Sequence, residues 1–423
     1  MRKRFLYNVA AALFFVFVFH GTPAHGSPVH GFVEGAYGAK FGDDRAEKNT
    51  FNLADVRLQL KYSYFPGFLD ALSGEVYAKG EALADGYDES LNAYFRELNL
   101  FLRPSEVMDI KAGRQILTWG TGDFLFINDL FPKDYVSFFT GRDDEYLKLP
   151  SDALRVWLFL DSVNLDFVLI PFFEPNSSIR GDRLSFFDGL KGEISGQATN
   201  RTFVEPAVSG ENMEFALRAY RNIRGYEAAF YFFNGFYKEP RGILDAAKEK
   251  FFYPRLRVYG FSLRGVVPGG IGTLEVGYYD SRNDPSGRDG NIENSSIKYL
   301  AGYTRDLGGD LKAGIQYEVD QILDYGGYTS SLSLGSPVRD EFRHLLTLRL
   351  TKLFLAQTLK AGLFAFYSPS DRDVYLRPSL SYDVSDNLRT TVGANIFSGR
   401  FDYTEFGSLE GNNNVYLRAR YSF

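Results

Sequence analysis

The sequence contains no cysteine and only four histidines among its 423 residues. The absence of cysteine excludes disulfide bonds, thiolate metal sites and covalent haem attachment. Three histidines, His20, His25 and His30, lie close to the amino terminus, and the fourth, His344, shares the spacing of neighbouring leucines. The sequence also has no G-x-S-x-G motif and no His-x-x-x-His pair. We therefore expect no enzymatic activity and no cofactor.

Long apolar runs and an excess of positive charge are also missing. The apolar run at Ala10–Phe19 is shorter than the ~20 residues that a membrane-spanning helix needs. It follows three basic residues and precedes the small-x-small sequence Ala-His-Gly at 24–26, which is typical of a secretory signal peptide. We predict a signal peptide over residues 1–26 and one mature domain over 27–423. Removal of the three basic residues changes the formal charge from −6 to −9, which argues against a nucleic-acid partner.

Aromatic residues are abundant, with 28 tyrosines and 40 phenylalanines, and one of them ends the chain. The last ten residues, Asn414–Phe423, alternate between apolar and polar side chains. A period of two indicates a β-strand with one apolar face and one polar face. The segment resembles the final strand of Gram-negative outer-membrane barrels, which the barrel-assembly machinery recognises by its terminal aromatic residue.

Similar alternation occurs in about 18 segments of about 8–11 residues, an even number of the length that suits transmembrane strands. Counted back from the carboxy terminus, short connections such as 384–387 and 305–310 alternate with long polar ones such as 321–341. The fold class we predict is all-β, a transmembrane antiparallel β-barrel of about 18 strands with long extracellular loops and short periplasmic turns. A soluble β-sandwich or β-helix would explain the alternation but not the loop lengths. We expect the bacterial outer membrane as the location, with its lipids and lipopolysaccharide as partners.

The polar faces of these strands predict a charged lumen. Basic residues fall mainly on the last strands and across the seam, whereas acidic residues fall on the others. Such a transverse field favours anionic solutes. An alternative is that the charges pair across neighbouring strands and only hydrate the lumen. The predicted pore-lining residues are Arg57, Lys61, Arg255, Arg257, Arg349, Arg377, Arg389, Arg418 and Arg420.

The segment from Gly113 to Pro150 is long, aromatic and rich in charge. We predict that it folds into the lumen and narrows it, as constriction loops do. The alternative is an aromatic girdle with a surface lid. The predicted constriction residues are Arg114, Gln115, Trp119, Asp123 and Asp129.

Within this segment Gly-Arg-Gln at 113–115, Trp-Gly at 119–120 and Leu-Pro at 149–150, with the strand that ends at 168–171, resemble alginate-export-type porins and related outer-membrane barrel families. The resemblance implies an 18-stranded diffusion pore with a basic constriction that passes an anionic polysaccharide or small anions. It also implies that four residues of this segment belong to the constriction, namely Arg114, Gln115, Trp119 and Asp123.

The predicted function is a porin for diffusion or export of small or polymeric, anionic, hydrophilic solutes. The alternative is a structural barrel that surrounds an inserted partner protein such as a multihaem cytochrome. A porin would conduct ions alone, whereas such a barrel would need its partner.

Overall fold

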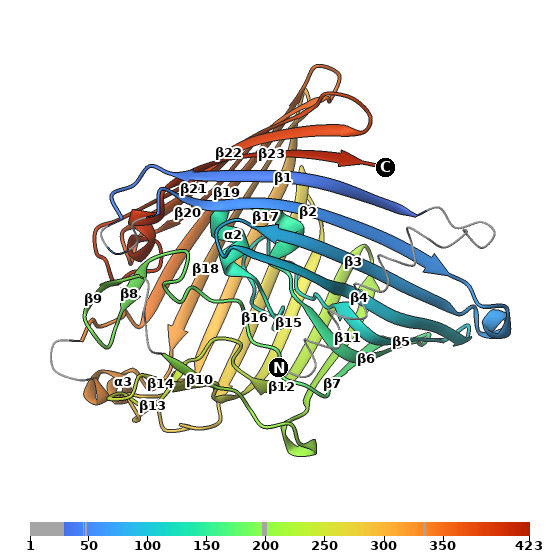
Figure 1. The fold of residues 1–423 in the computed structure, drawn as a ribbon. Coiled ribbons are helices and arrows are strands. Elements are labelled where there is room, and N and C mark those ends of the chain that lie inside the picture. Colours follow the sequence, from blue (N-terminus) through green and yellow to red (C-terminus); the bar gives the residue numbers. More distant parts are fainter. Residues whose placement is uncertain (1–28, 45, 47–48, 197–200, 333–335) are drawn as a thin grey trace.

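Eighteen antiparallel strands form one sheet in the computed structural model (Figure 1). The structure describes residues 29–44, 46, 49–196, 201–332 and 336–423, so the predicted signal peptide lies outside the described residues. The barrel strands are β1 (His30–Lys40), β2 (Phe51–Tyr64), β3 (Glu75–Asp85), β4 (Ser90–Ser105), β5 (Met108–Ile116), β6 (Pro150–Phe159), β7 (Asn164–Ile170), β11 (Glu214–Ile223), β12 (Tyr226–Phe236), β15 (Arg255–Val267), β16 (Gly270–Ser281), β17 (Ser296–Gly308), β18 (Leu311–Ile322), β19 (Phe342–Phe354), β20 (Leu359–Ser368), β21 (Asp373–Asp383), β22 (Leu388–Gly399) and β23 (Asn414–Ser422).

The first and last strands close the sheet into a barrel. β1 pairs with β23 from Phe32 opposite Ser422 to Lys40 opposite Asn414. The terminal Phe423 extends this pairing through two backbone hydrogen bonds with Gly31. Closure removes both sheet edges, which is what a strand-built membrane protein requires. The predicted antiparallel barrel of 18 strands is confirmed.

Connections of unequal length distinguish the two ends of the barrel. One end carries turns such as 224–225, 268–269 and 309–310, and the other carries loops such as 171–213 and 323–341. By the rule for outer-membrane barrels, the long loops define the extracellular end. Figure 1 shows the small loop elements β8, β9, β13, β14 and α3 gathered at this end. The elements outside the barrel wall are β8 (Phe186–Asp188), β9 (Glu193–Ser195), β10 (Thr202–Val204), β13 (Gly242–Asp245), β14 (Lys250–Phe252), α2 (Tyr135–Thr140), α3 (Tyr325–Ser331) and the 3-10 turns η1 (Gly67–Leu72), η2 (Asp144–Leu147), η3 (Gly210–Asn212) and η4 (Gly407–Asn412).

The two faces of each strand differ in exposure as the alternation predicts. On β12, Phe230 is 64% exposed and packs beside Phe261 of β15, whereas its neighbours Ala229 and Tyr231 are buried inside the barrel. Large apolar side chains thus cover the outer wall. None of the helices in the described ranges has the length and hydrophobicity of a membrane span.

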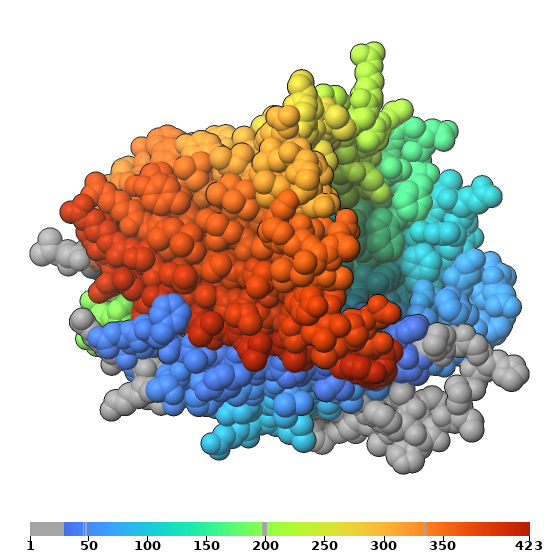
Figure 2. Space-filling model, turned by 90° about the horizontal axis from the view of Figure 1, so that it is seen from above, coloured from blue at the N-terminus to red at the C-terminus, as the bar shows by residue number. Residues whose placement is uncertain are grey.

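The hydrophobic core lies inside the barrel instead of between two layers. It is built from residues 117–149, which connect β5 to β6, and from inward side chains of the wall, including Tyr231, Val258 and Tyr375. We call residues 117–149 the inserted loop. The space-filling view in Figure 2 shows a hollow between the orange carboxy-terminal strands and the green and cyan wall. The lumen is therefore only partly filled.

Candidate functional site

The inserted loop carries the short helix α2 against the β20–β22 wall. The Asp134 carboxylate accepts a hydrogen bond from the Ser137 amide (2.9 Å) and caps the start of α2, and Gly141 ends it with a φ of 91°. Phe139 of α2 packs with its ring centroid 5.4 Å from Tyr375 and 5.5 Å from Phe397. Aromatic packing therefore holds one side of the loop to the wall.

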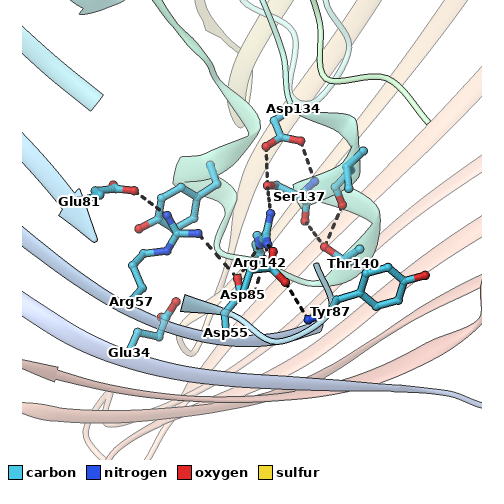
Figure 3. A network of polar contacts seen from close by, with 12 residues as sticks. Glu34, Asp55, Arg57, Glu81, Asp85, Tyr87, Asp134, Ser137, Thr140 and Arg142 are labelled. Carbon is cyan, nitrogen blue, oxygen red and sulfur yellow. Dashed lines mark hydrogen bonds and ion pairs between the residues drawn. The ribbon is translucent and has the colours of Figure 1, made fainter. Parts of the chain in front are cut away.

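Ion pairs hold the other side of the loop to β2 and β3 (Figure 3). Arg142 donates to Asp55 (2.7 Å) and to Asp85 (2.8 Å), and both carboxylates are buried. Arg57 lies over the ring of Tyr146 at 3.9 Å from its centroid and donates to Glu81 (2.5 Å). These contacts tie the loop to two separate parts of the wall, β20–β22 and β2–β3.

Acidic residues of the loop pair with the predicted basic stripe. Arg418 donates to Asp143 (2.8 Å), and Arg377 donates to Asp144 (2.8 Å). Arg420 contacts Asp143 at 3.5 Å. Burial alone would raise the pKa of Asp143, but Arg418 and Arg420 hold it below its usual value. The loop therefore neutralises part of the basic stripe, and neighbouring strands neutralise another part, as where Arg420 donates to Glu34 of β1 (2.8 Å).

Glu275 of β16 anchors the first part of the loop. Its buried carboxylate accepts hydrogen bonds from the backbone N–H groups of Thr121 and Gly122 (2.8 Å for Gly122), and from the Thr121 hydroxyl (2.6 Å). The Asn128 side-chain amide donates to the same carboxylate at 3.0 Å. Four donors converge on one side chain, so residues 121–128 are held tightly against β16.

Two cavities lie on opposite sides of this anchored segment along the same strands. One, of about 270 Å³, is lined by Thr273, Gly314 and Arg349 on the periplasmic halves of β16, β18 and β19. The other, of about 170 Å³, is lined by Tyr279 and Lys298 on the extracellular halves of β16 and β17. Loop residues line both cavities. The segment held by Glu275 therefore separates the two. We call the cavity on the extracellular side the outer cavity and the cavity on the periplasmic side the inner cavity.

Charge in the inner cavity comes from two arginines and one aspartate. Arg349 of β19 contacts Asp123 of the inserted loop at 2.6 Å, and Arg264 of β15 lines the same cavity. Burial raises the pKa of Asp123, although Arg349 opposes this effect. Arg264 was missing from the predicted set. Its alternation with Tyr259, Phe261 and Leu263 was a signal that could have identified it.

Seven of the nine predicted pore-lining residues lie on the lumen face of the wall. Arg377, Arg418 and Arg349 contact the inserted loop. Lys61 and Arg389 lie near the periplasmic end, and Arg389 donates to Asp383 at 2.5 Å. The lumen-facing set is Arg57, Lys61, Arg349, Arg377, Arg389, Arg418 and Arg420.

The prediction for Arg255 and Arg257 is wrong. The buried neighbours Leu256 and Val258 face the inserted loop, so the two arginines point outward with Tyr259, which is 48% exposed. The interior at this level is apolar because the loop fills it. The polar side of β15 is therefore the outer one here.

The prediction for Arg114 as a constriction residue is also wrong. Its partner across the β5–β6 pair is Asp152, which alternates with the core residue Ala153 and shares the outer face with Leu154. Arg114 contacts Asp152 at 3.4 Å and Glu174 at 3.5 Å. These contacts place Arg114 on the outside of the wall.

Of the other predicted constriction residues, Trp119 and Gln115 are buried, whereas Asp123 and Asp129 each line a cavity. Trp119 is buried in the core and donates to Asp166 of β7 (2.9 Å). Gln115 is buried and donates to the Ala153 carbonyl oxygen (3.0 Å). Asp129 accepts from Lys133 (2.9 Å) inside the loop. Asp123 alone lines the inner cavity.

Solved structures similar to this chain include three porins of two bacteria. OccK5 (OpdH) of Pseudomonas aeruginosa has a TM-score of 0.56 at 12% identity, and covers 94% of this chain and 98% of its own. OccD3 (OpdP) of the same organism scores 0.55 at 10% identity, with 95% and 92% covered. OccAB3 of Acinetobacter baumannii scores 0.55 at 11% identity, with 95% and 100% covered. These proteins are outer-membrane porins, which are channels and not enzymes.

No protein-family model and no curated protein sequence matches the chain. The structural likeness, at these identities, shows a common fold. The resemblance to alginate-export-type porins is therefore not confirmed beyond the porin fold.

Proposed function

We propose that this chain is a channel of the bacterial outer membrane through which small hydrophilic solutes pass along the β15–β19 wall. The closed barrel, its apolar outer face and its likeness in fold to porins support this proposal. The two cavities support the route, because they follow one another along the same strands. A solute would cross where residues 121–128 separate them.

The observation that carries the proposed preference for anions is the charge of the inner cavity. Arg264 and Arg349 face the cavity together with one carboxylate, that of Asp123, which leaves an excess of one positive charge. A positive charge between low-dielectric walls raises the local concentration of anions. Arginine also offers paired donors that match carboxylate and phosphate groups.

The inserted loop disfavours the two other functions considered. A barrel that surrounds a partner protein needs an open lumen, whereas here Arg142 ties the loop to β2 and Glu275 ties it to β16 on the opposite side of the barrel. A polymer would also have to pass the inserted loop, which packs with the wall as a hydrophobic core inside the barrel. We therefore propose small solutes rather than polysaccharides.

Reversal potentials of the purified protein in a planar bilayer under a salt gradient test the anion preference. We expect the wild type to favour anions, and the double variant Arg264→Glu/Arg349→Glu to favour cations. Arg221→Glu is the matched control, because Arg221 is exposed near the periplasmic end of β11 and binds the Ser162 carbonyl oxygen. Cation selectivity of the wild type would contradict the proposed preference.

A further inference from the structure

Three arginines form a patch on the outside of the barrel at its extracellular end. Arg255 and Arg257 of β15 point outward, and Arg282 follows β16 directly and donates its backbone N–H to the Arg255 carbonyl oxygen (3.0 Å). Arg255 and Arg282 are exposed, and Arg257 is half-buried. We call Arg255, Arg257 and Arg282 the outer arginine patch. It faces the membrane surroundings and not the lumen.

The charge of this patch is largely uncompensated. Arg255 donates to the Asn212 side-chain oxygen (2.6 Å) and to the Glu211 carbonyl oxygen, and Arg257 donates to Asn234 (3.3 Å). These acceptors are neutral, and no ion pair of Arg255 or Arg257 occurs in the described part of the chain. Only Arg282 has a carboxylate partner, Asp280, at 3.0 Å. The patch therefore keeps an excess of two positive charges.

Aromatic side chains lie directly below the patch, toward the membrane. Tyr259 follows Arg257 on the same face of β15, about 7 Å further along the strand. Its ring stacks on Tyr278 of β16 (6.4 Å between centroids) and packs against Phe232 of β12 (5.4 Å). Both tyrosines are exposed on the outer wall. Such a belt marks the level where acyl chains meet polar head groups.

The outer arginine patch and the aromatic side chains beneath it together favour one class of partner. Guanidinium groups bind phosphate through paired, charge-assisted hydrogen bonds. The aromatic belt beneath would contact sugar rings and the first methylene groups of acyl chains. A free inorganic anion would use only the arginines, whereas a phosphorylated glycolipid of the outer leaflet would use both parts.

We propose that the outer arginine patch and the aromatic residues beneath it bind a phosphorylated glycolipid of the outer leaflet, with its phosphates on Arg255, Arg257 and Arg282. This proposal rests on the outer-membrane location in the proposed function but not on channel activity. The patch lies on the outer wall, so lipid binding and ion conduction can be measured separately.

Native mass spectrometry of the purified full chain in detergent, titrated with bisphosphorylated lipid A or with its fully dephosphorylated form, tests the proposal. The wild type should bind the bisphosphorylated form more tightly. The variant Arg255→Gln/Arg257→Gln/Arg282→Gln should bind it about tenfold more weakly. Arg221→Gln, which removes an exposed arginine at the periplasmic end of the outer wall, should bind like the wild type.

Equal binding of the two lipid A forms by the wild type would overturn the proposal without any variant. Equal binding of bisphosphorylated lipid A by the triple variant and the wild type would also overturn it. Heat-dependent gel mobility checks that each variant is folded. If the triple variant conducts ions like the wild type but loses lipid A, the patch is confirmed separately. A protein that binds lipid A but does not conduct would contradict only the channel function.

Discussion

Replacement of Glu275 by alanine should release the first part of the inserted loop from the wall. The wild-type carboxylate accepts four hydrogen bonds from Thr121, Gly122 and Asn128 in a buried position. A buried donor left without an acceptor costs about 1–3 kcal/mol. If water satisfies one of the four donors, the remaining three cost at least about 3 kcal/mol, which shifts the equilibrium toward the detached loop by about a hundredfold.

Detachment should be visible in single-channel currents, because residues 121–128 separate the two cavities. We expect Glu275→Ala to show frequent transitions to levels of higher conductance that are rare in the wild type. Glu227→Ala is the matched control, since Glu227 is an acidic residue of β12, two strands from β16, that pairs with Arg218 (2.6 Å) instead of the loop. If both variants give the same current traces, the loop is not held by Glu275 and the reasoning fails.

Two further predictions concern charge. Because burial raises the pKa of Asp123, its carboxylate should become protonated at a higher pH than that of an ordinary aspartate, and the anion preference should increase as the pH is lowered. Reversal potentials of Asp123→Asn should not show this increase. An equal pH response of the wild type and Asp123→Asn would contradict the prediction. Neutralisation of Arg255 and Arg257 should leave the reversal potential unchanged, because both side chains point away from the lumen. A clear shift toward cation selectivity would show that they face the lumen after all.

The barrel was predictable from the sequence because its rules are local. Alternation with a period of two marks each strand, and the contrast between turns such as 309–310 and loops such as 171–213 fixes the orientation. The final segment Asn414–Phe423 pairs with the first strand as expected of a closed barrel. These features depend on residues that are close in the chain and on the lipid outside the barrel, which every strand contacts.

The lumen was less predictable because it depends on which parts of the chain meet there. Alternation predicts that a polar residue faces water inside the barrel, but next to the inserted loop the inside is a hydrophobic core. Leu256 and Val258 face that core, so Arg255 and Arg257 are displaced to the outer wall. Nor does the sequence show that Asp143 of the loop would neutralise Arg418. Such pairs join residues more than 200 positions apart in the chain.

The central claim, that the chain is a channel narrowed by its own loop, is tested most directly by one comparison in planar bilayers. The single-channel conductance of the wild type is measured against that of a variant that lacks Gly122–Asp134. Our account predicts that the wild type conducts ions without a partner protein and that the deletion raises its conductance severalfold. A wild type that does not conduct, or a folded deletion variant with unchanged conductance, would contradict it.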